Sequence, residues 1–230
     1  MADRSGTDEH VLRFKQEPIL KEQWAREDER LLWFDLPSQG YVASVIGGQS
    51  RIPHVALNEV RGSLVDAPEW PLPSEQLVNG RFLGEEWADD PSIMWWVFAA
   101  GPSEDAVLLG DHLVQVPDEA FLVMTTQRFA VVVKGKHLAD EEQASGGGLF
   151  GRAKAVAAQV QRVAESVKSD NGPVSYAEVP VERIARVEAV DLGCGIPRAT
   201  FIRLEFTDGS ALLARVPRGF AEAHAEHFAS

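Results

Sequence analysis

Short segments rich in Val, Phe, Thr and other β-prone residues are the feature that most constrains the fold of this chain. In the second half of the sequence they cover 106–116, 121–125, 129–134, 174–179, 187–192, 200–206 and 210–216. These runs are short for helices, and turn residues separate them. Asp208-Gly209 lies between the last two runs, which is a strong hairpin signal. We therefore expect about seven antiparallel strands, followed by a short helix at 220–228.

The beginning of the chain predicts a tail and then a helix. Residues 1–16 are polar with little periodic apolar content, so we expect a flexible tail. Leu20, Trp24 and Leu31 recur at helical spacing, which predicts a helix with one apolar stripe over about 18–32.

The tract that follows is less regular. Its sequence suggests strands at 41–46 and 54–60, and the three prolines of 66–73 predict a loop or linker. Asn79-Gly80 between apolar flanks suggests a hairpin, whereas Ser74 followed by acidic and amide residues suggests the start of a helix. The sequence alone leaves both interpretations open.

A Gly-rich hinge and an amphipathic helix are predicted within an insert at 135–172. Over 146–168 apolar residues recur every three or four positions, and four basic residues stand against Glu165 alone, a net charge of +3. Such a helix can pack on the protein's own sheet, bind a partner helix, or lie on an anionic membrane. For the last two cases the predicted contact residues are Leu149, Phe150, Arg152, Lys154, Arg162 and Lys168.

Charge and composition limit the function classes. The 230 residues carry a formal net charge of −13, which makes general nucleic-acid binding unfavourable. One cysteine excludes an internal disulfide framework and multi-cysteine zinc sites, and we expect no cofactor or metal. The longest apolar run, 93–100, is too short to span a membrane, and the polar N-terminus is not a secretory signal. We expect a cytoplasmic protein, with peripheral contact at the inner membrane face as an extension of that expectation.

Few residues are candidates for chemistry. Cys194 lies between two glycines, which is typical of a tight turn, and a nucleophilic thiol would also need a base. His224 and His227 are spaced like two metal ligands on a helix, but they lack the other ligands of a structural site. Trp95 and Trp96 are either core residues or a partner hot spot. No catalytic residue is predicted.

Four motifs resemble the bacterial pleckstrin-homology-like family across about 104–230: LLGDHLV, FLVMTTQRFAVV, EVPVERIARVEA and FIRLEFTDGSALL. The residues that match the family pattern are Thr125, Arg128, Pro180, Ile184, Val187, Phe206, Asp208 and Gly209. The resemblance implies an antiparallel barrel closed by a C-terminal helix. Lipid-binding members use basic residues near the first loops, whereas the matching loop here, Pro117-Asp118-Glu119, is acidic. That difference favours a protein partner over a phosphoinositide.

Together these observations predict an α+β, mainly β chain. A mixed extension at 17–100 would precede a pleckstrin-homology-like domain at 104–230, with the helical insert inside it. The predicted function is a non-enzymatic binding or adaptor module for an unidentified protein partner, with anionic membranes as a further surface. The alternative is a hydrolase or thiol enzyme that uses Cys194 or a histidine.

Overall fold

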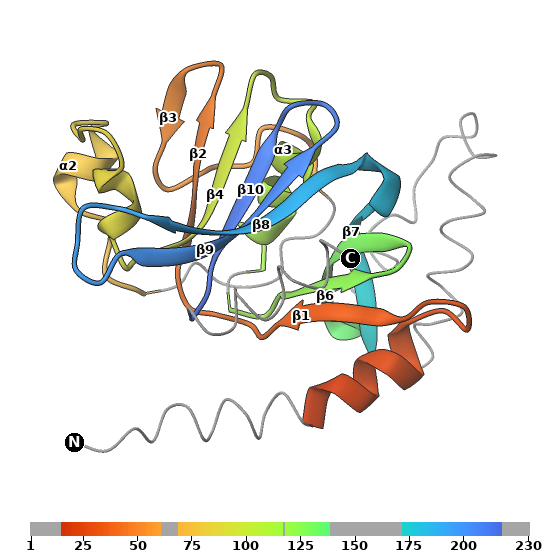
Figure 1. Cartoon of the computed structure of the whole chain (residues 1–230). Coiled ribbons are helices and arrows are strands. Elements are labelled where there is room, and N and C mark those ends of the chain that lie inside the picture. The colour runs from red at the N-terminus through yellow and green to blue at the C-terminus, as the bar shows by residue number, and fades with distance from the viewer. Residues whose placement is uncertain (1–14, 61–68, 117, 139–171, 218–230) are drawn as a thin grey trace, which may run out of the picture.

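Two β-sheets make up most of the structure, a computed structural model that describes residues 15–60, 69–116, 118–138 and 172–217 (Figure 1). The four-stranded sheet has the order β1 (Leu31–Asp35), β5 (Phe121–Thr125), β6 (Arg128–Lys134), β7 (Pro173–Pro180). The six-stranded sheet has the order β3 (Gln49–Arg51), β2 (Tyr41–Ile46), β4 (Ile93–Ala99), β10 (Ala211–Arg215), β9 (Ala199–Phe206), β8 (Ile184–Leu192). Among the strand pairs of the described residues, only β2–β4 is parallel.

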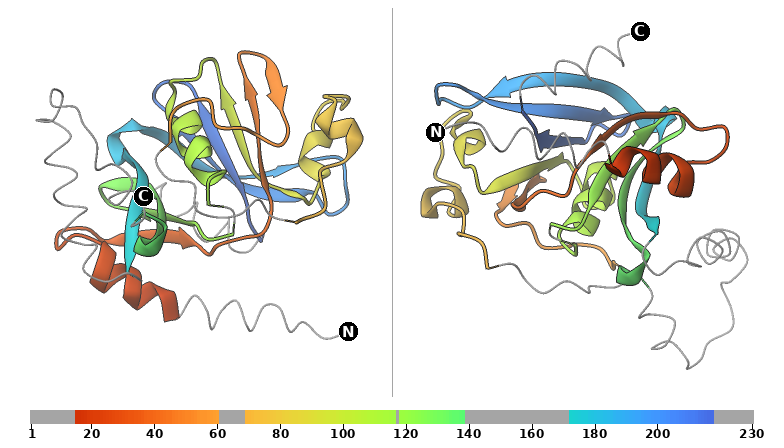
Figure 2. Two further views of the ribbon diagram at one scale, coloured as in Figure 1. Left: turned by 180° about the vertical axis from the view of Figure 1, so that it is seen from behind. Right: turned by 90° about the horizontal axis from the view of Figure 1, so that it is seen from below.

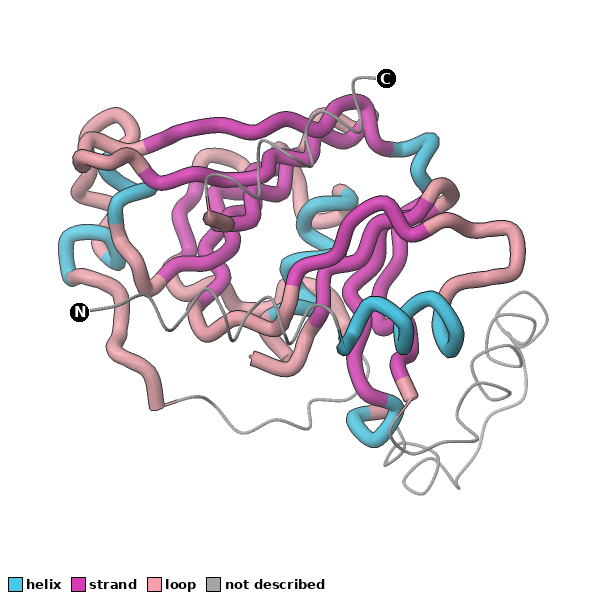
Figure 3. The backbone as a smooth tube through the Cα atoms, turned by 60° about the horizontal axis from the view of Figure 1, so that its bottom comes forward, coloured by secondary structure: helices cyan, strands magenta, loops and turns pink. Residues whose placement is uncertain are grey.

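Short helices connect and cover these strands. Residues 15–19 are α-helical, and the helix continues as the π-helical η1 (Leu20–Trp24). The other helices are α2 (Glu75–Val78), η2 (Glu86–Asp89), α3 (Asp105–Leu113), η3 (Gly135–His137) and η4 (Val181–Arg183). Figure 3 shows α3, the longest of these, between the two sets of strands.

The main core lies between the two sheets and around α3. Trp33 of β1 stacks on Phe129 of β6, with ring centroids 5.9 Å apart, and both side chains are buried. Val97 of β4 and Leu109 of α3 belong to the same cluster, so the helix joins the two sheets. Burial of this apolar surface is the main stabilising term for such a fold.

A separate cover protects the outer face of each sheet. The N-terminal helix packs Leu20 and Trp24 against Val132 and other outward residues of the four-stranded sheet (Figure 2). The segment 74–90 packs Leu77 and Trp87 against the outer face of the six-stranded sheet. In part of its area, each sheet is therefore apolar on both its inner and its outer face.

The mainly β, α+β class expected from sequence is confirmed, and so is the hairpin at Asp208-Gly209, where β9 pairs with β10. The runs at 41–46, 121–125, 129–134, 174–179, 187–192, 200–206 and 210–216 correspond to strands within a few residues. Neither sheet closes into a barrel. The pleckstrin-homology-like assignment therefore stays a prediction.

Three sequence predictions about secondary structure are wrong. The expected strand at 106–116 is the helix α3, because Ala106, Leu109 and Leu113 share the face that packs between the sheets. The helix expected over 18–32 ends at Trp24, and Leu31 already pairs with Thr125 as part of β1. The expected strand at 54–60 has no regular structure.

For the tract around 74–80 the sequence allowed either a hairpin at Asn79-Gly80 or a helix that starts at Ser74. The structure has the helix, since Glu75–Val78 is helical after Ser74. Residues 69–73 of the expected linker have no helix or strand. Strands of the expected extension pair with strands of the expected domain: β1 with β5, and β4 with β10. The boundary drawn near residues 100–104 therefore runs through both sheets. The predicted tail up to residue 14, the helices at 146–168 and 220–228, and His224 and His227 lie outside the described residues.

Candidate functional site

Ser44, His54 and Asp111 form a hydrogen-bonded chain in the interior. Ser44 is on β2, His54 follows β3, and Asp111 is on α3. Ser44 Oγ lies 2.8 Å from His54 Nδ1, and His54 Nε2 lies 2.8 Å from Asp111 Oδ1. The side chains of His54 and Asp111 have no exposed surface, and Ser44 is fully buried.

This chain has the composition of a catalytic triad but not its arrangement. In the serine-protease triad the histidine faces serine with Nε2 and the carboxylate with Nδ1, whereas His54 uses the two nitrogens the other way round. The Ser44 hydroxyl is also enclosed, so a substrate carbonyl has no route to it in this structure. The geometry suits a structural connection between β2, the loop after β3, and α3.

Asp111 anchors the loop that follows His54. Its carboxylate accepts hydrogen bonds from the backbone of Leu57 (3.1 Å) and Asn58 (3.0 Å) and from Asn58 Nδ2 (2.7 Å). Burial raises the pKa of Asp111, but the hydrogen bonds from His54, Leu57 and Asn58 outweigh it and hold the pKa below its ordinary value. A charged Asp111 is thus the form that the fold stabilises.

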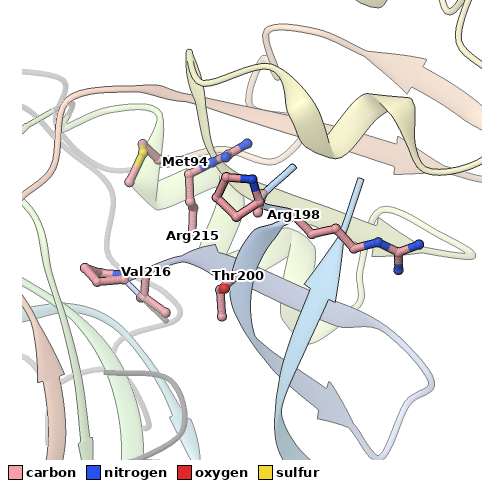
Figure 4. Close-up of a pocket in the computed structure, with 8 residues that line it drawn as sticks. Met94, Arg198, Thr200, Arg215 and Val216 are labelled. Atoms are coloured by element: carbon pink, nitrogen blue, oxygen red, sulfur yellow. The ribbon is translucent and has the colours of Figure 1, made fainter. Parts of the chain in front are cut away.

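A pocket of about 570 Å³ opens at one end of the six-stranded sheet (Figure 4). Its lining includes Met94 at the start of β4, Thr200 of β9 and Val216 after β10. Pro197, which precedes β9, and Pro217, which follows β10, also line it. The Thr200 hydroxyl donates to Asp191 at 2.7 Å. The polar group of Thr200 is therefore already engaged, and the lining that remains is mostly apolar.

Two arginines border this pocket without offering a free cation to its interior. Arg215 donates to the backbone carbonyls of Ile93 (3.1 Å), Asp90 (2.9 Å) and Ala88 (2.5 Å). Burial lowers the pKa of Arg215, and the nearby charges of Asp90 and Asp89 act in the opposite direction. Arg198 points away from Met94 and Val216 in Figure 4. The pocket is thus suited to an apolar side chain rather than to an anion.

A rigidly held loop projects beside the pocket. Asp89 accepts hydrogen bonds from the backbone N–H groups of Cys194 (2.8 Å) and Gly195 (3.0 Å), and Glu85 accepts one from Gly193 (3.3 Å). Consecutive N–H groups of this kind form an anion-binding nest, here filled by the protein's own carboxylates. Ile196, the next residue, is an exposed hydrophobic side chain with a relative accessibility of 101%.

The structure places the other sequence candidates as follows. Trp95 and Trp96 are 4% and 0% exposed and belong to clusters on opposite faces of the six-stranded sheet, as expected for core residues. Cys194 is exposed in the turn described above. The predicted contact residues Leu149, Phe150, Arg152, Lys154, Arg162 and Lys168 lie outside the described residues.

Among the described residues, no group of three or more His, Cys, Asp or Glu side chains could hold a metal ion. No helix in that part of the chain is long and apolar enough to cross a membrane. Comparisons with models of protein families, with curated proteins and with solved structures found no match.

Proposed function

We propose that the protein is a non-enzymatic binding module that recognises a protein partner at the pocket end of the six-stranded sheet. The observation that carries the proposal is the pairing of an apolar pocket with the exposed Ile196 on an anchored loop. A large aliphatic side chain has a hydrophobic cost when exposed, and a partner that covers it removes that cost. Because Asp89 already fixes the loop, little conformational entropy is lost on binding.

The chemistry of the pocket supports a protein ligand over a charged small molecule. Its threonine hydroxyl and one arginine are bound internally, and the whole chain has a net charge of −13. Phosphate-rich ligands would be repelled at long range. An apolar anchor residue from a partner, with a polar rim around it, matches the usual anatomy of interface hot spots.

The alternative, a hydrolase or thiol enzyme, has less support. The hydroxyl of Ser44 has the imidazole of His54 beside it, but this hydroxyl is enclosed in the interior. Cys194 is exposed, but the hydrogen bond found at this residue in the described structure joins its backbone N–H to Asp89. A nucleophile needs both access and a neighbouring base, and neither residue combines the two.

The test compares proteins retained from an extract of the source cells by the wild type and by pocket variants. Ile196→Asp removes the exposed anchor, Ala199→Trp fills the pocket, and Leu83→Asp makes the same polar change at another exposed site. The expected partner is retained by the wild type and by Leu83→Asp, then purified and shown to bind directly. Both pocket variants should weaken that binding about tenfold or more. The proposal fails if no protein is lost with both pocket variants.

A membrane contact through the insert is the second part of the proposal. Gly135 N donates to Gly172 O at 2.8 Å, so the segment between them leaves and rejoins the β6–β7 hairpin at one point. Such an appendage can contact a surface without disturbing either sheet. Residues 146–168, for which the sequence predicts a helix, have a net charge of +3 in an otherwise acidic chain, which favours anionic lipid at about 1 kcal/mol for each basic residue near the surface.

Co-sedimentation with liposomes of increasing anionic content tests this part. Binding should weaken as salt shortens the Debye length from about 10 Å at 0.1 M to about 3 Å at 1 M. Phe150→Ala should weaken it by removing the apolar anchor, and Arg152→Ala/Lys154→Ala by removing charge. If the wild type stays in the supernatant at low salt and high anionic content, the membrane contact is refuted, while the protein-binding proposal stands.

A further inference from the structure

The strand β8 forms one edge of the six-stranded sheet, and its other side has no partner strand among the described residues. None of its nine residues is buried, whereas the neighbouring β9 is buried at five of eight positions. Figure 2 shows β8 along the outer border of the molecule. The side of residues 185–189 that faces away from β9 has no strand partner in the part of the chain that the structure describes, and the backbone N–H and C=O groups of such an edge can bind another strand.

Charged side chains at this edge form an alternating pattern. Arg186 of β8 is opposite Glu205 of β9, and Glu188 is opposite Arg203. Within each strand the charges also alternate, because Arg186 pairs with Glu188 and Arg203 lies 2.7 Å from Glu205. The outer face of the edge is therefore a lattice in which every charge has neighbours of opposite sign.

We propose that two copies of this chain associate through antiparallel pairing of their β8 strands, with the two-fold axis at Val187. In this register Arg186 of each copy lies opposite Glu188 of the other copy, and Val187 lies opposite its own equivalent. Directly opposed residues of an antiparallel pair lie on the same face, within reach of each other. The alternating lattice then continues across the axis without a like-charge contact between directly opposed residues.

Charge complementarity sets this register, because moving the two-fold axis by one residue along β8 is unfavourable. An axis at Glu188 would oppose Glu188 to Glu188 at the centre of the pair, which is repulsive. On the opposite face of β8, Val187 contacts the edge of the main core, so a second Val187 would extend an apolar strip there. A symmetric contact of this kind is the commonest form of protein dimer.

The pairing is short and the dimer is correspondingly weak. The register between β8 and β9 shifts between Ile184 and Arg186, which is a bulge, and bulges are one way in which edge strands limit pairing. Regular pairing is thus confined to 186–188 and the small flanking residues Ala185 and Ala189. An interface of this size is typical of reversible association.

Sedimentation velocity across a wide range of protein concentration tests the proposal. The average mass of the wild type should rise from 25.2 kDa towards twice that value, and less so at high salt. Arg186→Glu and Glu188→Arg, each alone, create two like-charge contacts per dimer, so each should raise the dissociation constant about tenfold or more. Arg81→Glu, at an exposed position near α2, is the control and should behave as the wild type.

An equal mixture of Arg186→Glu and Glu188→Arg gives the sharper result. In the mixed pair, both acidic residues of one copy face both basic residues of the other, so a heterodimer should form where neither variant alone dimerises. A variant that merely misfolded could not be rescued in this way. A wild type that stays monomeric at every concentration would overturn the proposal, as would dimerisation that neither reversal changes. The proposal is also overturned if mixing the two variants does not restore a dimer.

Discussion

Both sheets have an apolar outer face, and different kinds of side-chain contact cover the two faces. On the four-stranded sheet, Arg128 is the centre of the cover: it donates to Glu29 at 2.9 and 3.1 Å, pairs with Glu178, and lies 4.3 Å from the centroid of the Trp24 ring. The Glu29 side chain has no exposed surface. The segment after the N-terminal helix is therefore attached by a largely buried ion cluster, and the helix itself contributes the Trp24 ring to it.

On the six-stranded sheet, the cover is aromatic. The ring of Trp87 lies 4.6 Å from that of Trp96, 5.3 Å from Phe98 and 6.3 Å from Phe201. Aromatic pairs in such tilted arrangements add to the stability gained by burying their surface. Asp90, which directly follows η2, accepts hydrogen bonds from the backbone N–H groups of Ser74 (2.9 Å) and Ser92 (3.0 Å) and from the Ser92 hydroxyl (2.6 Å).

The comparison teaches that the two covers should respond differently to mutation. A buried ion cluster contributes little net stability when complete, because desolvation offsets the attraction between charges, yet it is costly when one member is lost. An aromatic cover loses stability in proportion to the surface and contacts removed. The four changes below test this difference, from the largest effect to the smallest.

Replacing Arg128 by Ala should reduce the free energy of unfolding by about 3–5 kcal/mol, because it leaves the buried Glu29 without its cation. Urea unfolding at neutral pH measures the change. Arg26→Ala is a matched control, since Arg26 lies within 3.7 Å of Glu29 and 3.6 Å of Glu178 but is 46% exposed. Its loss should cost less than about 1 kcal/mol. Equal effects of the two variants would contradict the ion-cluster description.

Replacing Trp87 by Ala should cost about 2–4 kcal/mol, somewhat less than for a fully buried tryptophan because Trp87 is half-buried. Thermal unfolding of this variant is compared with Leu83→Ala, a change in the same segment at a residue that is 79% exposed. The control should stay within about 0.5 kcal/mol of the wild type. If Trp87→Ala is no more destabilising than Leu83→Ala, the aromatic cover is not what holds this segment.

Asp90→Asn should cost about 1 kcal/mol at neutral pH, as expected for weaker, partly solvated hydrogen bonds. Burial raises the pKa of Asp90, but bonds from Ser92 and Ser74 outweigh it and leave the pKa below its ordinary value. A lowered folded pKa contributes stability above the unfolded pKa of about 3.9, and this is lost as the pH falls through the folded value. The difference between wild type and variant should therefore shrink below about pH 4. A difference that is constant with pH would refute the role of the charge.

Sequence reasoning found most strands because their turns are local signals. β9 and β10 are joined by Asp208-Gly209, and Gly209 has the positive φ of 88° that such a turn requires. The helix α3 was missed because it is buried between two sheets and apolar on most of its surface, so its period is obscured. Its start is also fixed from a distance: Asp208 and Ser210 accept the backbone N–H groups of Asp105 and Ala106.

The candidate site was less accessible to sequence reasoning than the strands. Ser44, His54 and Asp111 are separated by 10 and 57 positions, and only the tertiary structure brings them together. The central strand β4 reads as an uninterrupted apolar run because its two faces enter different clusters. Sequence reasoning did not single out Ile196, because its part in the proposed binding surface follows from its exposure and from the pocket next to it, and both depend on the tertiary structure.

Removing residues 136–171 and joining Gly135 to Gly172 through Asn-Gly should have the smallest effect, within about 1 kcal/mol of the wild type. Gly135 N already donates to Gly172 O at 2.8 Å, just beyond the end of the β6–β7 pair, and a two-residue Asn-Gly turn fits a hairpin that is closed by a hydrogen-bonded pair of this kind. A shorter loop lowers the entropic cost of closure, which offsets the loss of Leu138, a half-buried residue at the edge of the core. Neither cover uses the deleted residues in the described contacts, so Arg128→Ala and Trp87→Ala should cost the same in the shortened chain. Urea unfolding and far-ultraviolet circular dichroism measure this, and loss of the β signal would show that the insert is part of the folded core.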